Sequence, residues 1–468
     1  MQPPKDRILE ILNYINSEFA LAMNGTSFSK HSPFDGSVLA QVTNSDAMDV
    51  IKAIQAAKKA HTAWKELAPA DRATYLLKIA DYLEQNAEEI SYQEALHQGL
   101  AQSFSRLNNI DVAIKNLKLV ANEVSLPLPA KVLTSSVGVV GIITAWTLSL
   151  RLVTERLAPA LAAGNTVIIK VSEHSPITAK ILANAMAAAN LPAGVVNILN
   201  GSSEVGQVLA GHPGIRAISA VGKTSTMEAV AKEGVSQFKK LQLSGSAKNP
   251  CLILGDTDYK NLLPQILYPF LMGQAQLCWN ISRIFILESQ AKEFTEEVKN
   301  YLENLQPLKD PKGQEVWTPL ISPAAIDSIA EKVGSGRQEH GKILVGAEKS
   351  ALSGNFYRPT VMLDLSNCSV LQQDELQGPL LLVTPVKYQH EMLKWANTAY
   401  LGHSAVVWGP EEKLMKLSSG LECAHVFLNG WLNGEPLTIF GSKQSSFGNP
   451  DMSWAGSFYS DVKKLTGL

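Results

Sequence analysis

The chain has 468 residues, more than one hydrophobic core usually organises, so its length favours two or more lobes. Its formal net charge of -2 and its 46% content of hydrophobic residues are ordinary for a soluble globular protein. Neither sign of charge dominates, which argues against a nucleic-acid-binding protein. The longest apolar runs reach about ten residues, well short of the roughly 20 that cross a bilayer, which argues against a membrane protein.

The amino terminus is charged and has helical periodicity in its first turns, without the apolar core and cleavage site of a signal peptide. We therefore predict a cytoplasmic protein. The four cysteines, Cys251, Cys278, Cys368 and Cys423, form neither a CxxC pair nor a metal-ligand spacing. In a reducing compartment they are expected to be free thiols, three of them inert core residues.

Helical spacing of apolar residues characterises the chain from residue 47 to residue 120. Residues 47–67 and 69–90 carry apolar side chains three and four positions apart, with Asp, Lys and Glu on the other face. This pattern predicts two amphipathic surface helices.

Short β-branched runs then alternate with helical segments. Strands are expected within 135–144, 164–172, 194–201, 215–222 and 239–245, with helices after the first two. Such alternation predicts a parallel sheet with helical crossovers, of the kind that binds nucleotides. No G-x-G-x-x-G follows any of these strands, so the dinucleotide fingerprint is absent.

A second α/β lobe is predicted from residue 249 onward. Further strand-like runs occur at 283–288, 342–346, 380–388 and 404–409, with helical segments between them. The sequence contains no internal repeat and no low-complexity linker, so the two lobes are expected to pack against each other.

The segment "GQAQLCWNISR", residues 273–283, places Cys278 in a small and polar setting. Free cysteines are usually buried and only fill space, so a structural thiol is the simpler interpretation. A helix beginning near Cys278 would instead direct its positive dipole end at the sulfur and favour a nucleophilic thiolate.

Together with other segments in the same order, this region resembles the aldehyde dehydrogenase superfamily. The resemblance covers nearly the whole chain and rests on "GIITAWTLSL", "KVSEHSP", "AVGKTS", "LQLSGSAKNP", "GQAQLCWNISR", "DELQGPLL", "VFLNGW" and "IFGSKQSS". It implies an α/β fold: a Rossmann-type NAD-binding domain over 1–122 and 137–248, a catalytic domain over 249–425, and an oligomerisation β-extension over 123–136 and 455–468. A homodimer or homotetramer would follow, although an ordinary intrachain hairpin would have the same pattern.

The resemblance also implies a mechanism for a small aldehyde substrate. Cys278 would attack the carbonyl carbon to form a thiohemiacetal, and hydride transfer to a nicotinamide would leave a thioester. The backbone N–H of Cys278 and the side chain of Thr147 would stabilise the oxyanion. A base, at position 242 in the family, would activate water to release the acid.

Several residues are expected to bind the cofactor. Lys170 and Glu173 follow an apolar strand, and a glutamate there accepts hydrogen bonds from ribose hydroxyls and repels a 2′-phosphate, which favours NAD over NADP. A solvated ion pair is the alternative interpretation. By resemblance, Glu375 would reach the nicotinamide ribose, Trp146 would pack beside the adenine end, and Gly222 would lie in the phosphate-proximal loop. Trp146 could equally be a core aromatic.

The sequence departs from the family pattern at the chemistry itself. Gln242 replaces the glutamate base and cannot accept a proton, and Thr147 replaces an oxyanion asparagine. Lys223 replaces a small hydroxyl residue and could contact the pyrophosphate, whereas Met227 replaces a second glycine and could obstruct it. Gln377 replaces an aromatic residue near the nicotinamide.

Three functions therefore stay open. The first is NAD-dependent oxidation of an aldehyde to a carboxylic acid, with impaired hydrolysis. The second transfers the acyl group to coenzyme A and needs no hydrolytic base. The third is a cofactor-binding or assembly protein without activity. No metal is expected. Trp279, beside Cys278, indicates either an apolar aldehyde pocket or a core position.

Overall fold

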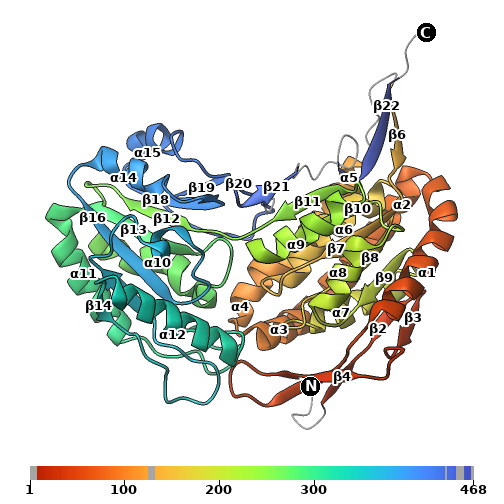
Figure 1. Cartoon of the computed structure of the whole chain (residues 1–468), viewed down its shortest axis with the longest axis horizontal. Helices are drawn as coiled ribbons and strands as arrows, with labels where there is room; N and C mark the ends of the chain where they lie inside the picture. Colours follow the sequence, from red (N-terminus) through yellow and green to blue (C-terminus); the bar gives the residue numbers. More distant parts are fainter. Residues whose placement is uncertain (1–7, 125–131, 438–439, 449–457, 465–468) are drawn as a thin grey trace.

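The computed structural model describes residues 8–124, 132–437, 440–448 and 458–464. Two α/β halves lie side by side, each built on its own mostly parallel sheet (Figure 1). Within these described residues, no helix is both long and apolar enough to cross a membrane.

The first sheet has the predicted parallel core. Its order is β21-β11-β10-β7-β8-β9-β2-β3, in which the strands from β11 to β9 are parallel and β21, β2 and β3 are antiparallel to their neighbours. β7 and β8 are rich in β-branched residues and buried along their whole length, as expected for a sheet covered on both faces. The strands are β2 (Asn13–Ile15), β3 (Glu18–Ala20), β7 (Val139–Ile143), β8 (Thr166–Lys170), β9 (Val196–Leu199), β10 (Ala217–Val221), β11 (Lys240–Ser244) and β21 (Ser446–Phe447).

Helices cover both faces of this sheet. One face packs on α2, α5, α6 and α7, and the other packs on α1, α8 and α9, because alternate strand residues such as Val140 and Val139 point to opposite sides. The two amphipathic helices predicted after residue 46 are confirmed as α1 and α2. The helices are α1 (Ala47–Glu66), α2 (Pro69–Gln85), α3 (Ala87–Gln98), α4 (Gln102–Ser105), the π-helical η1 (Arg106–Ile110), α5 (Asp111–Glu123), α6 (Ser149–Ala162), α7 (Ile177–Ala188), α8 (Ser203–Gly211) and α9 (Thr224–Val235).

The second sheet begins at the predicted position. Its order is β14-β15-β16-β13-β12-β18-β19, and only β14 is antiparallel. Helices α10 and α11 pack on one face, and α14 and α15 pack on the other. The strands are β12 (Asn249–Ile253), β13 (Ile281–Leu287), β14 (Lys342–Val345), β15 (Thr360–Leu363), β16 (Leu380–Val386), β18 (Ser404–Trp408) and β19 (His425–Leu428). The helices are α10 (Tyr259–Leu271), the 3₁₀ turn η2 (Met272–Ala275), α11 (Glu288–Glu303), α12 (Pro323–Gln338), α13 (Val370–Gln373), α14 (Gln389–Ala396) and α15 (Glu411–Ser418).

The helical periodicity predicted for the amino terminus is wrong where the structure describes it. β2 and β3 extend the first sheet, and β1 (Leu9–Ile11) joins β5 (Val38–Thr43) and β4 (Ser27–His31) in a small sheet. Pairing of β2 with β9 and of β1 with β5 buries Ile11, Tyr14 and Ile15, and this tertiary burial overrides a weak local propensity.

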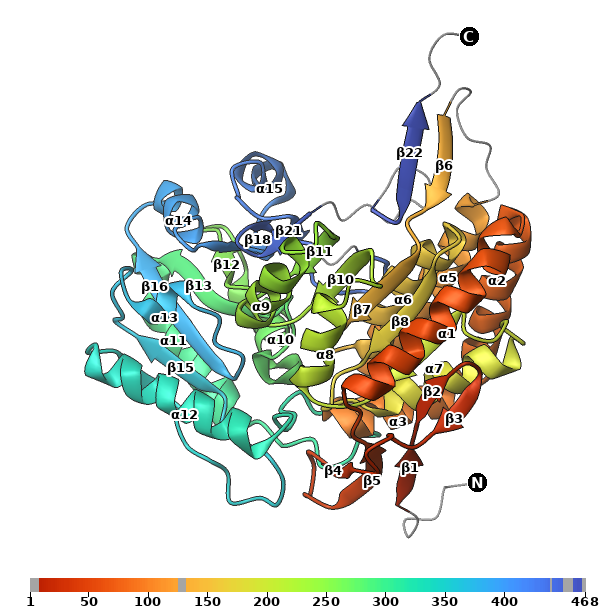
Figure 2. The same ribbon diagram turned by 45° about the vertical axis from the view of Figure 1, so that its right-hand side comes forward.

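A two-stranded antiparallel ribbon extends from the body beside the first sheet (Figures 1 and 2). It pairs β6 (Val132–Ser136) with β22 (Ser460–Lys464) of the same chain. Lys240 anchors its base by an ion pair with Asp461 at 2.8 Å. The ribbon comprises parts of the two predicted oligomerisation segments, and the rest of both segments lies partly outside the described residues. A further short pair joins β17 (Leu401–Gly402) to β20 (Ser442–Lys443).

Candidate active site

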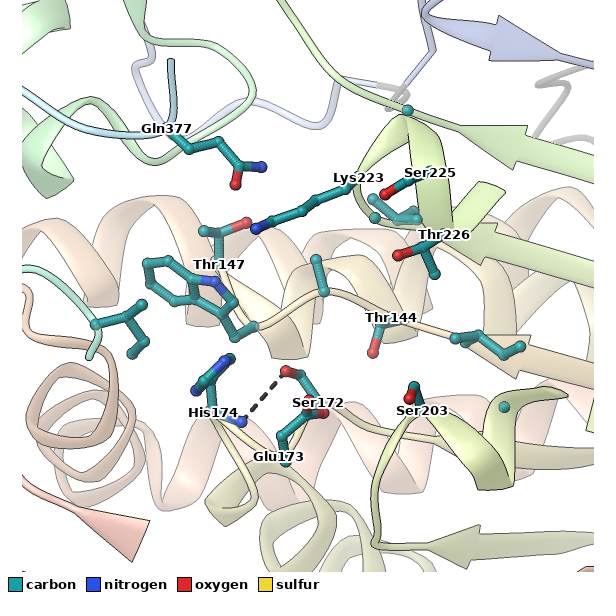
Figure 3. A pocket seen from close by; sticks show the side chains of 18 of the residues that line it. Thr144, Thr147, Ser172, Glu173, His174, Ser203, Lys223, Ser225, Thr226 and Gln377 are labelled. Atoms are coloured by element: carbon teal, nitrogen blue, oxygen red, sulfur yellow. Dashed lines mark hydrogen bonds between the residues drawn. The ribbon is translucent and has the colours of Figure 1, made fainter. Parts of the chain in front are cut away.

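A cavity of about 590 Å³ lies where loops of the two halves meet. The loops that follow β7, β8, β9, β10 and β11 form one wall, which is the carboxyl edge where open α/β sheets bind ligands. The Cys278 turn, the first turn of α12 and the Glu375 loop form the other wall. In Figure 3 the side chain of Lys223 extends into this space, opposite Ser172, Glu173 and His174.

The cavity brings together most of the residues singled out from the sequence. Its lining includes Trp146, Thr147, Lys170, Glu173, Gly222, Lys223, Cys278, Glu375 and Gln377. It also includes His174 and Gln276, which sequence reasoning missed. His174 directly follows Glu173, and position alone was its only signal.

Cys278 does not begin a helix, so the helix-dipole prediction is wrong. The thiol lies in a turn between η2 and β13, after three residues with positive φ, Gly273 (66°), Gln274 (53°) and Ala275 (54°). Two asparagines that the sequence analysis missed hold this turn. Asn249 donates to the carbonyls of Cys278 and Asn280 at 2.8 Å each, and Asn280 accepts from the Leu277 amide at 2.6 Å. Side-chain hydrogen bonds, rather than a helix, therefore position the sulfur.

The thiol of Cys278 is half-buried and protonated at neutral pH. Burial raises its pKa to about 12, and the positive charge of Arg151 acts in the opposite direction. Arg151 lies on α6 and is 1% exposed, and its guanidinium is 4.4 Å from the ring centre of Trp279. Reaction at Cys278 thus requires proton removal when the substrate is bound.

Thr147 lies two residues before α6, and a buried network fixes the start of that helix. Leu148 has a left-handed backbone with φ 47°, and its amide donates to Gln98 at 2.9 Å. The Arg151 amide donates to Asn109 at 2.9 Å, and both amide side chains donate to the carboxyl of Glu94. Burial raises the pKa of Glu94 to about 7 despite these donors.

Lys170 and Glu173 form an ion pair at one end of the cavity. The Lys170 ammonium lies 2.9 Å from the Glu173 carboxylate, and it is 5% exposed. Burial is the largest single effect and raises the pKa of Glu173, but the Lys170 charge, the hydrogen bonds to the carboxylate and the His174 charge together outweigh it and leave this pKa lowered. Glu173 is therefore ionised at neutral pH and can accept hydrogen bonds from a diol.

Glu375 is held on the opposite wall by several donors. It accepts from the Ala247 amide at 3.1 Å and from the Gln377 side chain at 2.7 Å. Lys332 on α12 donates to the carbonyls of Glu375 and Leu376. Gln377, which replaces the family's aromatic residue, thus orients a carboxylate instead of providing a ring face.

Gln242 is not part of the cavity lining. Its side-chain oxygen accepts a hydrogen bond from the Ser219 hydroxyl at 2.7 Å, on the neighbouring strand β10. Met227 also lies away from the lining and is 6% exposed within the helix-facing core, so the expected obstruction by its side chain is not observed. Its methyl group packs beside Gly222, 3.3 Å from where a Cβ would stand.

Two further expectations can be judged from burial. Trp279 is 1% exposed, in the core between Arg151 and His403, which agrees with its core interpretation. All four cysteines are free thiols, but Cys368 is exposed, so its assignment to the core is wrong. Asn429, in the segment "VFLNGW" that carries part of the resemblance, lies outside the cavity lining and exchanges hydrogen bonds with the Gly409 backbone.

Comparison with known proteins agrees with the geometry. The sequence model of the Aldehyde dehydrogenase family matches residues 21–465. The chain is 30% identical to 2-aminomuconic semialdehyde dehydrogenase of Mus musculus, over 99% of each chain. Among solved structures, HpcC from Thermus thermophilus has a TM-score of 0.90 and 30% identity, covering 98% of this chain and 93% of that one. The NAD+ complex of aldehyde dehydrogenase from Bacillus cereus has a TM-score of 0.91 and 26% identity, covering 97% and 96%. The chain therefore belongs to the aldehyde dehydrogenase family, a family of oxidoreductases.

Proposed function

We propose that this protein oxidises a small aldehyde, with NAD as the hydride acceptor, through a thiohemiacetal and a thioester on Cys278. The observation that carries the proposal is that Cys278, Thr147, Lys170, Glu173 and Glu375 line one cavity. The similarity to the NAD+ complex of the Bacillus cereus enzyme supports the choice of cofactor.

The residues present fit a dinucleotide. Glu173 is ionised beside Lys170 and suits a ribose diol, and the backbone at Gly222 is unshielded by a Cβ at the start of α9. Lys223 extends into the cavity from the same turn and suits a pyrophosphate (Figure 3). When bound, the nicotinamide would serve as the hydride acceptor.

The chain itself supplies the nucleophile and the oxyanion donors. The sulfur of Cys278 forms a bond to the carbonyl carbon as the thiol proton passes to solvent, and the electron pair of the carbonyl π bond moves to oxygen to give an oxyanion. The Cys278 amide and the Thr147 hydroxyl are the proposed donors to that oxyanion. Departure of hydride from the same carbon restores the carbonyl as a thioester, and one substrate molecule is oxidised by two electrons.

Hydrolysis of the thioester is the step that this site supports least. Among the described residues that line the cavity, the carboxylates are Glu173, paired with Lys170, and Glu375, which accepts from Ala247 and Gln377. Gln242 has no proton-accepting group and faces Ser219. Loss of a positioned base costs about 10²–10⁴ in rate, so the thioester should accumulate.

A second candidate function is transfer of the acyl group from Cys278 to coenzyme A. The orientation of the Gln242 side chain toward Ser219 favours it. A thiolate acceptor attacks the thioester carbonyl without a base that activates water, so the missing glutamate would matter less.

Rapid mixing with NAD and a panel of aldehydes, including a semialdehyde, tests these proposals. The expected result is a burst of NADH close to one per site, a slow steady rate, and an acyl mass on Cys278 in the intact protein. Acceleration by added coenzyme A would select the transfer reaction. No NADH and no adduct, with Cys278→Ala as the reference, would refute both reactions and leave the non-enzymatic alternative.

We also propose that the sequence-based domain boundaries hold and that the β6–β22 ribbon mediates a homodimer or homotetramer. Within the described residues, each ribbon strand pairs only with the other, which leaves both outer edges open to another strand. Light scattering coupled to size exclusion tests this assembly: a monomer at all concentrations would contradict it.

A further inference from the structure

A second cavity, of about 440 Å³, adjoins the proposed cofactor cavity. The two share Glu173, His174, Ile321 and Ser322 in their linings. The second cavity is otherwise lined by Phe28, Ser29, Lys30, His31, Asn44, Ser202, Pro323 and Asn355. It therefore lies between strand β4 and the starts of α8 and α12, on the far side of the Glu173 loop.

Lys30 is a buried cation in the lining of this cavity, and it has no counter-ion among the residues that the structure describes. It projects from β4 and is 5% exposed, as buried as Lys170. Lys170 has an ion pair with Glu173 at 2.9 Å, whereas Lys30 makes no side-chain hydrogen bond or ion pair with any residue that the structure describes. Burial of an unpaired ammonium is costly, so a residue of this kind indicates an anion that binds from outside the chain.

Other groups around Lys30 can donate hydrogen bonds to an anion. His31 and His174 line the cavity. Burial lowers the pKa of His174 and of His97, with the Lys30 charge contributing, so these two imidazoles are neutral donors at neutral pH. Ser202 and Ser322 cap the amino termini of α8 and α12, whose dipoles are positive at that end. Glu173 is the acid in this lining, and its charge is engaged by Lys170.

We propose that the second cavity is a binding site for a phosphate-type anion, with the Lys30 ammonium as its counter-ion. His174 lines both cavities and so connects this site to the cofactor cavity. The chemistry is that of a tetrahedral oxyanion with several acceptor oxygens, which an ammonium and capped helix termini recognise. Two sources supply it: free phosphate or a phosphate monoester, and the 2′-phosphate of NADP.

Occupation of the site should depend on pH in a defined direction. Burial lowers the pKa of Lys30 to about 7, and burial also lowers the pKa of His174, with Lys30 contributing. Anion binding requires the protonated ammonium, so it should be strong below pH 7 and weaken above it. His31 and His97 face the same region, so Lys30 substitution is needed to assign the effect.

Calorimetric titration of the cofactor-free chain with inorganic phosphate and with sulfate tests the site. Sulfate keeps its charge between about pH 6 and pH 9, so a change in its affinity over this range comes from titration of the protein alone. We expect sulfate to bind at least about tenfold more weakly at the higher pH, and Lys30→Met to lose about tenfold or more at the lower pH. Lys59→Met, an exposed lysine on α1, is the matched control and should bind as the wild type does.

Misfolding of the variant is separable from loss of the site. Removing an unpaired buried charge should leave the melting temperature of Lys30→Met unchanged or raise it in anion-free buffer. Undetectable anion binding to the wild type at the lower pH, or equal affinity of wild type and Lys30→Met, would overturn the proposal.

A second arm distinguishes the two sources and rests on the proposed function, because it uses the dinucleotide. If Lys30→Met weakens NADP binding and leaves NAD binding unchanged, the 2′-phosphate is the source. If phosphate binds equally well with NAD at saturation, the source is a free anion. Absence of dehydrogenase activity would refute the proposed function and leave the anion titration unaffected.

Discussion

The guanidinium of Arg151 lies over the ring of Trp279, 4.4 Å from its centre, and Trp279 directly follows Cys278 in the chain. Arg151 lies on α6, so the contact holds a buried positive charge near the Cys278 thiol. Burial raises the pKa of Cys278, and the charge of Arg151 lowers it. Stacking on an aromatic face holds a guanidinium in one orientation. Arg151 is thus a positioning residue, because its fixed charge favours the thiolate form of Cys278.

Arg151→Met should make Cys278 less reactive. Loss of the positive charge raises the thiol pKa further, so the fraction of thiolate at pH 8 to 9 falls, and a pKa higher by one corresponds to roughly a tenfold smaller fraction. The measurement is the rate of iodoacetamide labelling of Cys278 as a function of pH. Arg358→Met is the matched control, because Arg358 stacks on Trp317 at 4.8 Å and does not contribute to the Cys278 pKa. Equal labelling profiles of wild type and Arg151→Met would contradict the assignment.

Cys278→Ala should abolish NADH formation and adduct formation, a loss of at least about 10³-fold, because no second thiol lines the cavity among the described residues. Cys368→Ala is the control: Cys368 is exposed and should be dispensable, with activity within about twofold of wild type. Steady-state and burst assays with the same aldehyde measure both. Retained activity in Cys278→Ala would disprove the covalent mechanism.

Glu173→Gln should change the choice of cofactor. The variant loses charge-assisted hydrogen bonds to a ribose diol, which should weaken NAD binding by about 10- to 100-fold. It also removes the negative charge that repels a 2′-phosphate, so the ratio of NAD to NADP affinity should fall. Fluorescence titration with both dinucleotides tests this. An unchanged ratio would mean that Glu173 serves only as the partner of Lys170.

Gln242→Glu alone should not restore hydrolysis. The side chain is held by the Ser219 hydroxyl at 2.7 Å and does not line the cavity, so the new carboxylate should keep the same position. We expect the acyl-enzyme decay rate to change by less than about threefold, with Ser219→Ala as the companion variant. A gain of about 10²-fold or more would show that position 242 reaches the thioester during turnover.

Glu94 should give stability a measurable pH dependence. The folded chain retains the proton on Glu94 up to about pH 7, whereas the unfolded carboxyl loses it near 4.5. The contribution to stability is therefore fully present below pH 4.5 and is lost as pH rises to about 7. Glu94→Gln resembles the protonated form, so the difference in free energy of unfolding between it and wild type should change across this range by at most about 3 kcal/mol.

Urea unfolding at several pH values measures that difference. Glu89→Gln, an exposed acid on the same helix, is the control and should follow the wild type. A pH-independent difference between Glu94→Gln and wild type would mean that Glu94 is ionised in the folded chain.

The architecture and the order of most elements could be predicted from local sequence patterns. Buried parallel strands such as β7 and β8 are mostly apolar, and surface helices such as α1 are amphipathic, so both leave patterns that can be read without a structure. The Lys170 and Glu173 ion pair was also predictable, because its two members lie only three positions apart at the end of a strand.

Features that depend on residues far apart in the chain became visible only in the folded protein. The amino-terminal strands form only because β9 and β5 offer pairing edges, and the Cys278 turn is shaped by Asn249, 29 residues away. The direction of the Gln242 side chain depends on Ser219 in the neighbouring strand. The position of Lys30 follows from the fold, which brings β4 to the same cavity as the starts of α8 and α12. Periodicity reports which face of an element is buried, whereas partners, side-chain direction and unpaired charge are set by long-range contacts.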